Sequence, residues 1–359
     1  MVNPCRSLHL LLVSTPVGPL GSGLGGGVEL TLHNIAQALT QRGHQITILA
    51  PTGSSLGDFN VIPVEGKLQP LAQNQERDAA ITLPAQAVLG AMWQQAKLLA
   101  PQYDVLVNFA YDWLPFYLTP WFDRPIAHLV SMASLTDAMD DAIAQVVARY
   151  PHTVAVHSLA QAETFAFGDR CRCLGNGLDL SHYRFVAEPD TYLGWVGRIA
   201  PEKGIEDAIA AADQSHLSLK VWGAMPDPDY WQQVCRTYPN ADVSYQGFLS
   251  TAELQAQLGQ CRGLLVTPRW VEAFGNVVIE ALACGVPVIA YRRGGPAEIV
   301  THGQTGWVVE PDSVEALVEA IARLPELDRH RCRQAAEEHY SLAALGARVE
   351  DWLQTMLEG

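Results

Sequence analysis

The sequence predicts an α/β protein with two domains, each built on a parallel sheet. Short apolar stretches of strand length alternate with amphipathic stretches of helix length along most of the chain. This alternation occurs twice, and the stretch 179–189, which has mixed polarity and no clear period, lies between the two halves. Strands joined by helices form parallel sheets that are covered on both faces. With 359 residues, of which 48% are hydrophobic and 17% charged, the chain can bury two such cores.

The first half begins with the apolar strand Leu8–Val13, which precedes a glycine-rich loop. A helix at Val28–Arg42 follows, because its apolar residues recur at helical spacing until Gly43. Another helix is predicted at Val88–Ala100. The remaining strands of this half are predicted at Ile46–Ala50, Val105–Phe109, Ile126–Val130 and Thr153–Val156.

The second half repeats the alternation. Its strands are predicted at Tyr192–Val196, Leu219–Trp222, Val243–Tyr245, Gly263–Val266 and Val286–Ala290. Its helices are predicted at Gly204–Ala212, Trp231–Arg236, Thr251–Leu258, Val277–Cys284 and Ala297–Val300, with a last helix near Leu342–Leu357. We therefore expect a first domain over 1–185, a second over 186–340, and a C-terminal helix over 341–359 that packs back toward the first domain. Open parallel sheets bind ligands outside the carboxyl ends of their strands, which predicts a ligand in a cleft between the domains.

The net charge of −15 argues against a nucleic-acid partner, which needs a basic surface, and against docking on an anionic membrane. The apolar run Leu8–Val13 is too short to span a bilayer and is interpreted as a buried strand. The seven cysteines are scattered, and only Cys171 and Cys173 lie close together, without a spacing typical of zinc sites. Reduced thiols and a cytoplasmic location are expected.

The most informative segment runs from Glu272 to Glu280 with the sequence Glu-Ala-Phe-Gly-Asn-Val-Val-Ile-Glu. It follows a predicted strand and opens a helix near Asn276. The first-turn amides of that helix have no partner within it and attract anions. Glu280 lies one turn beyond Asn276 on the same helical face. Two carboxylates that flank a phosphate-binding turn suit sugar hydroxyls on one side of a diphosphate and ribose hydroxyls on the other.

A second segment, Gly197-Arg-Ile-Ala-Pro-Glu-Lys-Gly204, directly follows a predicted strand. Its two cations, Arg198 and Lys203, can clamp a diphosphate, because the guanidinium binds as a fork and the ammonium as a point charge. The alternative is an ordinary solvated loop.

The third segment is the glycine-rich loop, in which Gly21, Gly23 and Gly26 form the pattern G-x-G-x-x-G of dinucleotide sites. The glycines begin several residues after the strand, and the second strand ends in Pro51-Thr52 without a carboxylate for a ribose. We therefore expect a flexible loop that closes over a phosphate or an acceptor and whose amides lead into a helix N-terminus. The candidate residues of this loop are Gly25, Gly26 and Gly27.

Together these motifs resemble the retaining glycosyltransferases of family four, which have the GT-B fold of two Rossmann-like parallel-sheet domains facing a central cleft. The resemblance extends over nearly the whole chain. Its elements are Gly26-Gly27-Val-Glu29, Arg42-Gly43-His44, Asn176-Gly177-Leu-Asp179, Gly197-Arg198 with Lys203-Gly204, Gly247-Phe248, Glu272 to Glu280, and Gly294-Gly295-Pro-Ala-Glu298.

The resemblance implies a role for each matching position. Arg198 and Lys203 would bind the diphosphate, and Glu280 the ribose. Glu272 would hold the donor sugar together with the backbone amides of Phe274, Gly275, Asn276 and Val277, and the backbone near Phe248 and Leu249 would meet the base. The family's active-site histidine follows a first-domain strand, where this chain has His128; a merely structural histidine is the alternative. Glu272 and His128 are thus the candidate catalytic residues. Asn176-Gly177 is either a family element or a simple turn.

No metal or cofactor is expected, because cationic side chains and helix amides can hold the diphosphate. The chain departs from the family's commoner pattern at Thr267-Pro268-Arg269, and this departure leaves the partner of Arg269 open.

The segment Val13–Glu29 is similar to the opening of UDP-glucose:tetrahydrobiopterin α-glucosyltransferases, which implies UDP-glucose as donor and a pterin as acceptor. Aromatic residues crowd one first-domain segment, and planar heterocycles stack well on them. Tyr111 and Trp113 are the candidate acceptor residues, and ordinary core packing is the alternative. These aromatic residues are Phe109, Tyr111, Trp113, Phe116, Tyr117 and Trp121.

Three other functions compete with this interpretation. The same transfer could serve a polysaccharide, a sugar phosphate or a lipid. A sugar-nucleotide-binding protein without turnover is disfavoured by the presence of both Glu272 and Glu280. A nicotinamide oxidoreductase is disfavoured by the way the second strand ends.

Overall fold

The computed structural model describes residues 6–70 and 76–358, and the chain divides into two compact units. Unit 1 comprises Met1–Gly177 together with Leu342–Gly359, and unit 2 comprises Leu178–Ser341. The division after Gly177 lies several residues before the expected boundary at 185. The last helix of the chain belongs to unit 1.

Unit 1 is built on a parallel sheet that has seven strands within the described residues, in the order β3-β2-β1-β4-β5-β6-β7. The order reverses between β1 and β4, which are neighbours in the sheet. In doubly wound sheets, ligands bind outside the carboxyl ends of the strands at such a reversal. The strands are β1 (His9–Val13), β2 (Gln45–Pro51), β3 (Asn60–Val64), β4 (Val105–Asn108), β5 (Ile126–Leu129), β6 (Val154–Val156) and β7 (Arg172–Cys173).

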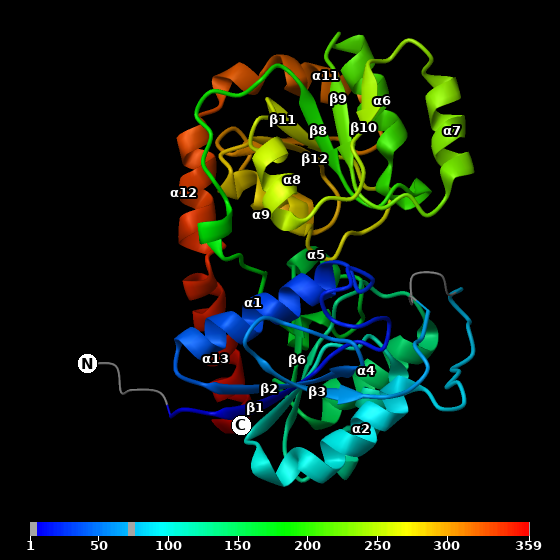
Figure 1. Cartoon of the computed structure of the whole chain (residues 1–359), viewed down its shortest axis with the longest axis vertical. Helices are drawn as coiled ribbons and strands as arrows, with labels where there is room; N and C mark the ends of the chain where they lie inside the picture. The colour runs from blue at the N-terminus through cyan, green and yellow to red at the C-terminus, as the bar shows by residue number, and fades with distance from the viewer. Residues whose placement is uncertain (1–5, 71–75, 359) are drawn as a thin grey trace. The chain divides into compact units, whose positions relative to one another are not determined.

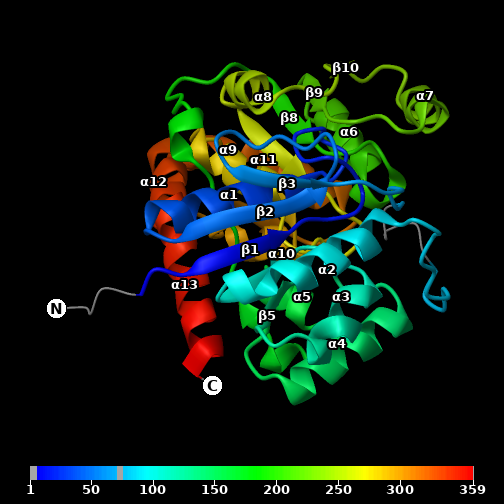
Figure 2. The same ribbon diagram turned by 60° about the horizontal axis from the view of Figure 1, so that its bottom comes forward.

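Helices cover both faces of this sheet. The alternation of side chains along β1 explains how: Leu10 and Leu12 pack with α1 and α13 on one face, while Leu11 and Val13 pack with α2 on the other. Figure 2 shows α1 and α2 on opposite sides of β1, β2 and β3. The helices of unit 1 are α1 (Gly27–Gln41), α2 (Val88–Leu99), α3 (Trp113–Leu118), α4 (Asp137–Arg149), α5 (Leu159–Ala162) and α13 (Leu342–Glu358).

The motif Arg42-Gly43-His44 fastens α13 to the rest of unit 1. The carboxylate of Glu350 on α13 pairs with the Arg42 guanidinium, and its Oε1 lies 3.1 Å from Nε2 of His44. The other ring nitrogen of His44 accepts the amide of Leu8 at 3.2 Å. Gly346 allows close approach, since a Cβ there would lie 3.2 Å from the carbonyl oxygen of Ala38 in α1. This family element is therefore structural in unit 1.

Unit 2 is built on a second parallel sheet, with six strands in the described residues and the order β10-β9-β8-β11-β12-β13 (Figure 1). Here the order reverses between β8 and β11, which pair with each other. The strands are β8 (Leu193–Val196), β9 (Leu219–Trp222), β10 (Val243–Tyr245), β11 (Gly263–Val266), β12 (Val288–Tyr291) and β13 (Gly306–Val309).

The helices of unit 2 pack on both faces of its sheet, with α12 against α9 and α11 against α6. Single 3-10 turns precede β8 (Leu180–His182) and α6 (Pro201–Lys203). The helices are α6 (Ile205–Gln214), α7 (Pro228–Thr237), α8 (Thr251–Leu258), α9 (Asn276–Ala283), α10 (Gly295–Ile299), α11 (Val314–Ala322) and α12 (Arg329–His339).

The predicted α/β class with two parallel sheets is confirmed, although several elements escaped the sequence patterns. Strand β3 contains Pro63, which cannot donate to a ladder and is tolerated because β3 is an edge strand. The predictions also lacked β7, β13, α11 and α12, and α3, α4 and α5 of unit 1. In the described part of the chain, no helix combines the length and apolarity needed to cross a membrane.

Candidate functional site

Two loops of unit 2 leave the sheet at the reversal of strand order. The first, Gly197–Gly204, follows β8, and the second, Thr267–Gly275, follows β11. Because β8 and β11 are adjacent parallel strands, both loops start from the same edge of the sheet. The sequence-predicted residues Arg198, Lys203 and Glu272 all lie on these loops.

Lys203 and Glu272 form an ion pair that joins the two loops. The ammonium contacts Oε2 of Glu272, and each side chain is about one-fifth exposed. Trp270, which the sequence analysis missed, donates its indole N–H to the same oxygen at 3.0 Å. The Lys203 ammonium also lies 5.2 Å from the centre of the Trp270 ring. A tryptophan two residues before the first glutamate of the motif was the available sequence signal for this contact.

Arg198, the other predicted cation, pairs with Glu202 one turn along its own loop. Both side chains are partly exposed, with relative accessibilities of 28% and 30%. Each predicted diphosphate ligand thus has a carboxylate as an ionic partner. Ion pairs at this level of exposure are weak, so an incoming phosphate can replace the carboxylate.

The loop that carries Glu272 is braced by two further arginines. Arg269 forms ion pairs with Asp207 at 3.1 Å and with Glu206 at 3.6 Å, both in the first turn of α6. Arg293 donates to the carbonyl oxygen of Pro268 at 2.8 Å and also pairs with Asp312. The question left open by the sequence is thereby answered: Arg269 holds the loop to α6.

Glycines let a neighbouring segment approach the same loop closely. Gly294 has φ +68°, and a Cβ there would lie 2.5 Å from the carbonyl oxygen of Glu272. That oxygen accepts the amide of Gly295 at 2.8 Å. The Gly294-Gly295 element of the sequence therefore positions the backbone of Glu272.

Helix α9 begins where the second loop ends. Gly275 precedes the helix with φ +96°, a conformation that favours glycine, and a Cβ there would lie 2.8 Å from Pro296. Within the described residues, Gly275 at the N-cap position makes no side-chain cap hydrogen bond and no acidic residue lies in the first turn, so the positive end of the helix dipole suits an anion. The first turn contains the predicted residues Asn276 and Val277. Phe274 is buried, and its ring packs near Tyr340, so its side chain serves the core.

Glu280 lies on α9 and is buried, with 8% of its surface exposed. The Tyr183 hydroxyl donates to its Oε1 at 3.1 Å. Burial raises the pKa of Glu280 to about 7, because the charged form loses water, while the hydrogen bond from Tyr183 opposes this rise. A buried carboxylate that titrates near neutral pH is typical of functional sites.

The predicted base-binding residues follow the edge strand β10. Phe248 is 67% exposed, an unusual position for a large aromatic ring, and Leu249 is partly buried. Gly247 precedes them with φ +86°, and its carbonyl oxygen accepts the amide of Gly223, which holds the turn against the segment that follows β9. An exposed aromatic face beside a fixed backbone turn can stack a planar ring.

The glycine-rich loop of unit 1 is folded around the carboxylate of Glu29. Its backbone amides donate to the two carboxylate oxygens from Gly21 at 2.9 Å, Gly23 at 3.2 Å and Gly25 at 2.6 Å. Gly26 then adopts φ +56°, and α1 begins at Gly27. The amide of Gly25 thus serves the carboxylate of Glu29, and a phosphate-binding role of Gly25, Gly26 and Gly27 stays a prediction.

His128 lies inside unit 1, with no exposed surface. One ring nitrogen lies 3.2 Å from the Asn108 amide and the other 2.9 Å from the Thr119 hydroxyl, and the ring stacks on Phe116. Burial lowers the pKa of His128 to about 3, so the ring is neutral. These contacts favour the structural alternative for His128, and a catalytic role of this residue stays a prediction.

The two candidate acceptor residues of unit 1 differ in their contacts. The hydroxyl of Tyr111 accepts the amide of Leu135 at 3.3 Å and donates to the carbonyl of Ala133 at 3.4 Å, which ties this ring to the fold. Trp113 stacks on Tyr117 with 4.3 Å between ring centres, and Tyr117 is half exposed. Asp112 caps α3 between them. Tyr111 and Trp113 both pack against the buried core of unit 1, and Tyr117 is the more exposed ring of the stacked pair.

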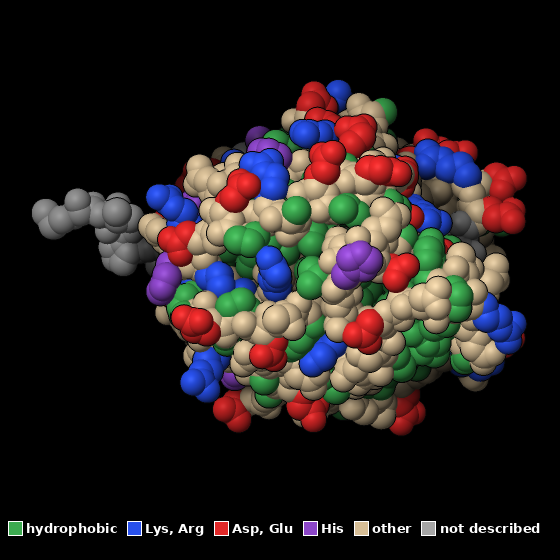
Figure 3. Space-filling view, turned by 90° about the horizontal axis from the view of Figure 1, so that it is seen from above, with side chains coloured by type: hydrophobic (Ala, Val, Ile, Leu, Met, Phe, Trp, Pro, Cys, Tyr) green, Lys and Arg blue, Asp and Glu red, His purple; other side chains and the backbone are tan. Residues whose placement is uncertain are grey.

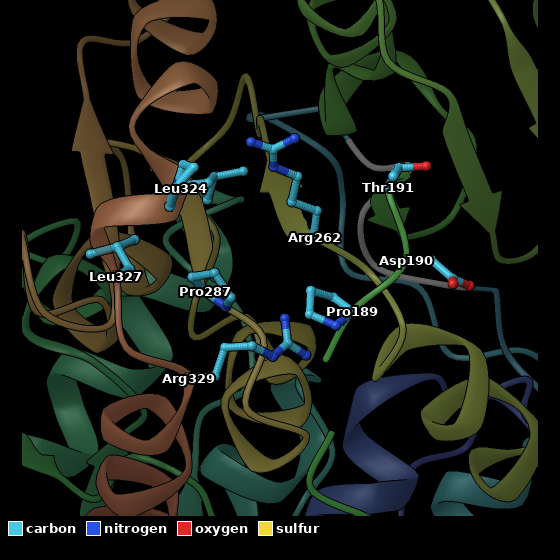
Figure 4. A pocket seen from close by; sticks show the side chains of 9 residues that line it. Pro189, Asp190, Thr191, Arg262, Pro287, Leu324, Leu327 and Arg329 are labelled. Atoms are coloured by element: carbon cyan, nitrogen blue, oxygen red, sulfur yellow. The ribbon is translucent and has the colours of Figure 1, made fainter. Parts of the chain in front are cut away.

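Unit 2 also contains a pocket of about 340 Å³ at the other edge of its sheet (Figure 4). Its lining residues Thr191, Arg262 and Pro287 precede β8, β11 and β12, so the pocket lies at the amino ends of these strands. Arg329 lines it and donates to the carbonyl oxygens of Val186, Gly259 and Cys261. This pocket is therefore separate from the loops that carry the predicted ligands.

Figure 3 shows a face on which acidic and basic side chains are interspersed among hydrophobic ones. Among the described residues, no group of three or more His, Cys, Asp or Glu side chains has the arrangement of a metal site. Arg198 and Lys203 are two cations of these loops that can neutralise a phosphate.

Comparison with known families assigns a model to each part of the chain. Residues 25–182 match the model described as Glycosyltransferase Family 4, and residues 184–339 match the model described as Glycosyl transferases group 1. Glycogen synthase of Mycobacterium tuberculosis is 25% identical, over 92% of this chain and 90% of the relative. Sucrose synthase of Solanum tuberosum is 41% identical over 70 residues, and this match spans only 9% of the relative's length.

Two solved structures share the fold over almost the whole chain. HepE of Anabaena, solved in complex with UDP and glucose, is 17% identical, with a TM-score of 0.77 and 97% of this chain and 100% of that one covered. Sucrose-phosphate synthase of Thermosynechococcus elongatus is 18% identical, with a TM-score of 0.76 and coverages of 98% and 100%. At these identities the two structures establish the fold.

Proposed function

This chain belongs to the group 1 and family 4 glycosyltransferases of the GT-B fold, and we propose that it transfers glucose from UDP-glucose to a small acceptor with retention of the anomeric configuration. As a glycosyltransferase it takes its sugar from a nucleotide sugar. The observation that carries the proposal is the grouping of Arg198, Lys203 and Glu272 on two loops at one edge of the unit 2 sheet, beside the start of α9.

The donor diphosphate takes the place of two carboxylates in this proposal. Arg198 exchanges Glu202 for one phosphate, and Lys203 exchanges Glu272 for the other, so that both cations neutralise the negative charge of the leaving group. Glu272, released from the ammonium, accepts hydrogen bonds from sugar hydroxyls. Trp270 keeps its own hydrogen bond to Glu272 and limits the rotation of the carboxylate.

The reaction exchanges one bond for another at the anomeric carbon. The bond from this carbon to the diphosphate oxygen breaks, and a bond to the acceptor hydroxyl oxygen forms. The hydroxyl proton leaves with the diphosphate, as the family's retention and the neutral, enclosed His128 both favour. An α-linked donor then yields an α-linked product.

Support for UDP-glucose comes from proteins of the same fold. HepE was solved in complex with UDP and glucose and in complex with UDP-glucose. In unit 2, the exposed ring of Phe248 suits a planar base, and the carboxylate of Glu280 suits ribose hydroxyls.

For the acceptor we propose a reduced pterin, with tetrahydrobiopterin as the first choice. The stacked pair Trp113 and Tyr117 in unit 1 supports a planar acceptor, because heterocycles pack well against aromatic faces. A pterin is uncharged at neutral pH, which suits a chain with a net charge of −15.

A glucan or other sugar is the second candidate acceptor. It is favoured by the glycogen synthase relative, whose match covers nine-tenths of both chains. Binding of a pterin needs the stacked rings of Trp113 and Tyr117, whereas binding of a glucan does not.

A competition assay decides between them. The protein is incubated with UDP-glucose, tetrahydrobiopterin and a short glucan, and products are identified by mass and by the anomeric coupling in NMR. The proposal predicts an α-glucosylated pterin as the product of the wild-type protein. The Trp113→Ala variant should no longer form this product. Trp121→Ala, which removes an exposed tryptophan of the same segment, should still form it. Glucan products alone would refute the pterin acceptor, and a β-linkage would refute retention.

A further inference from the structure

Glu280 is a largely buried carboxylate with one hydrogen-bond partner among the described residues. Its Oε1 accepts the Tyr183 hydroxyl at 3.1 Å, and this is the one hydrogen bond that the carboxylate makes to residues within the described ranges. The donor is a neutral phenol, although the carboxylate is buried. Burying a carboxylate is costly unless it is fully hydrogen-bonded, so a site of this kind favours a ligand that brings further donors.

We propose that Tyr183 is a positioning residue for the donor: its hydroxyl fixes one oxygen of Glu280 so that the other oxygen is presented to the ribose hydroxyls of the nucleotide. This inference rests on the proposed role of Glu280 in binding the nucleotide of the donor. It adds a residue that the sequence motifs and the comparisons leave unassigned.

Tyr183 can position Glu280 because its own backbone is fastened to the same helix. One guanidinium nitrogen of Arg333, Nη1, donates to the carbonyl oxygen of Tyr183 at 2.8 Å and to that of Ala283 at 2.7 Å. Ala283 is the last residue of α9, the helix that carries Glu280. Tyr183 is thus attached to α9 at two points, through its hydroxyl and through its backbone.

Arg333 is itself held in place. Its Nε donates to Glu337 at 2.7 Å on the next turn of α12, and α12 packs along α9. The order of contacts is therefore Glu337 to Arg333, Arg333 to the backbone of Tyr183, and the Tyr183 hydroxyl to Glu280. A side chain held in this way loses little further freedom when a ligand binds, which favours affinity.

The Tyr183 hydroxyl remains a donor at all relevant pH values. Tyr183 is 5% exposed, and burial together with the neighbouring charge of Glu280 raises the pKa of the phenol well above its usual range. The other titratable groups near this pair are Asp179, Cys284 and Arg333. The phenol therefore stays protonated and donates a hydrogen bond to Glu280.

Tyr183→Phe tests this inference, because phenylalanine keeps the ring packing and removes only the hydroxyl. Calorimetry measures the affinity of wild type and variant for UDP and for 2′,3′-dideoxy-UDP, which lacks both ribose hydroxyls. We expect the variant to bind UDP about tenfold more weakly, the effect of losing one hydrogen bond to a charged group, and to bind the dideoxy nucleotide as wild type does. In turnover, the KM for the donor should rise with little change in kcat.

Tyr192→Phe is the matched control. Tyr192 is also buried in unit 2, and its hydroxyl donates to the carbonyl of Gln257 at 2.8 Å, away from Glu280. The Tyr192→Phe variant should bind UDP and 2′,3′-dideoxy-UDP with the affinities of the wild-type protein. In Arg333→Lys, the ammonium cannot hold both carbonyl groups as one planar guanidinium does. This variant should lose less affinity for UDP than Tyr183→Phe does and should keep its affinity for the dideoxy nucleotide.

The possible outcomes test the positioning role of Tyr183 and the proposed function separately. An equal loss for both nucleotides, or no loss in Tyr183→Phe when Glu280→Gln does weaken UDP, would overturn the positioning role alone. A wild-type protein that binds no UDP would overturn the proposed function, and this inference with it.

Discussion

Glu29 and Glu272 are both carboxylic acid residues that glycines approach closely, yet their carboxylates have different kinds of partner. Glu29 in unit 1 is enclosed by three backbone amides of its own loop. Glu272 in unit 2 contacts two side chains, Lys203 and Trp270. Backbone amides are fixed by the fold, whereas a lysine side chain can turn to another anion. The first carboxylate is therefore part of the structure, and the second is available for exchange with a ligand.

His128 and Glu280 repeat this contrast. Both ring nitrogens of His128 have partners inside unit 1, so the ring has no capacity left for a ligand. Glu280 has a partner on one oxygen. The remaining hydrogen-bonding capacity, rather than burial, thus separates Glu280 from His128.

The largest effect expected from this contrast is on turnover in Glu272→Gln. The amide keeps the shape but loses the charge that pairs with Lys203 and that accepts the sugar hydroxyls. We expect kcat/KM to fall by about a hundredfold or more, as for other groups that act in the transition state. Steady-state kinetics measure it, with Glu319→Gln, an exposed glutamate on α11, as the control. Unchanged kinetics would place Glu272 with Glu29 among the structural carboxylates.

Glu29→Ala should affect stability instead of donor binding. Three amides would lose their acceptor, and we expect the free energy of unfolding to fall by about 3 kcal/mol, while UDP affinity stays within twofold. Denaturant unfolding and calorimetry test the two parts, and Glu65→Ala, an exposed site in unit 1, is the control. A stable variant with weakened UDP binding would mean that the glycine-rich loop serves the nucleotide after all.

Glu280 should give opposite pH dependences for stability and for affinity. Its pKa in the folded protein is raised to about 7, above the ordinary value near 4.5, so the folded state binds the proton more tightly than the unfolded chain does. The free energy of unfolding should therefore decline as the pH rises from 4.5 to 7 and level off above. The charged carboxylate is the better acceptor, so UDP should bind more tightly as the pH rises through 7.

Glu280→Gln provides the check on this assignment. The amide does not titrate, so both pH dependences should flatten together. If the affinity of this variant for UDP still changed with pH near pH 7, by as much as about tenfold per pH unit, a group other than Glu280 would be responsible for the pH dependence.

The sequence predicted the parts of the protein that depend on periodicity and on charged residues at strand ends. Alternating apolar stretches predicted most strands of both sheets, and Arg198, Lys203 and Glu272 were proposed as ligands because their charged groups follow predicted strands. Side chains whose role depends on distant partners could not be found in this way. The enclosure of His128 needs Asn108 and Thr119, and the contact of Tyr183 with Glu280 joins residues far apart in the chain.

Strand β3 shows a different limit. Its proline argues against a strand in any local pattern, and only its position at the sheet edge makes Pro63 acceptable. Edge position follows from the strand order of the whole unit, which a local pattern does not contain.

The central claim is that the loops of unit 2 bind a nucleoside diphosphate. Calorimetric titration of UDP into the wild-type protein and into the Arg198→Ala variant tests this claim most directly. The wild-type protein should bind UDP, and the variant should bind it about tenfold or more weakly, because a charge-assisted hydrogen bond to phosphate is lost. Uridine, which lacks the phosphates, should bind both proteins equally weakly. Equal UDP affinity in the folded variant and in wild type would contradict the claim.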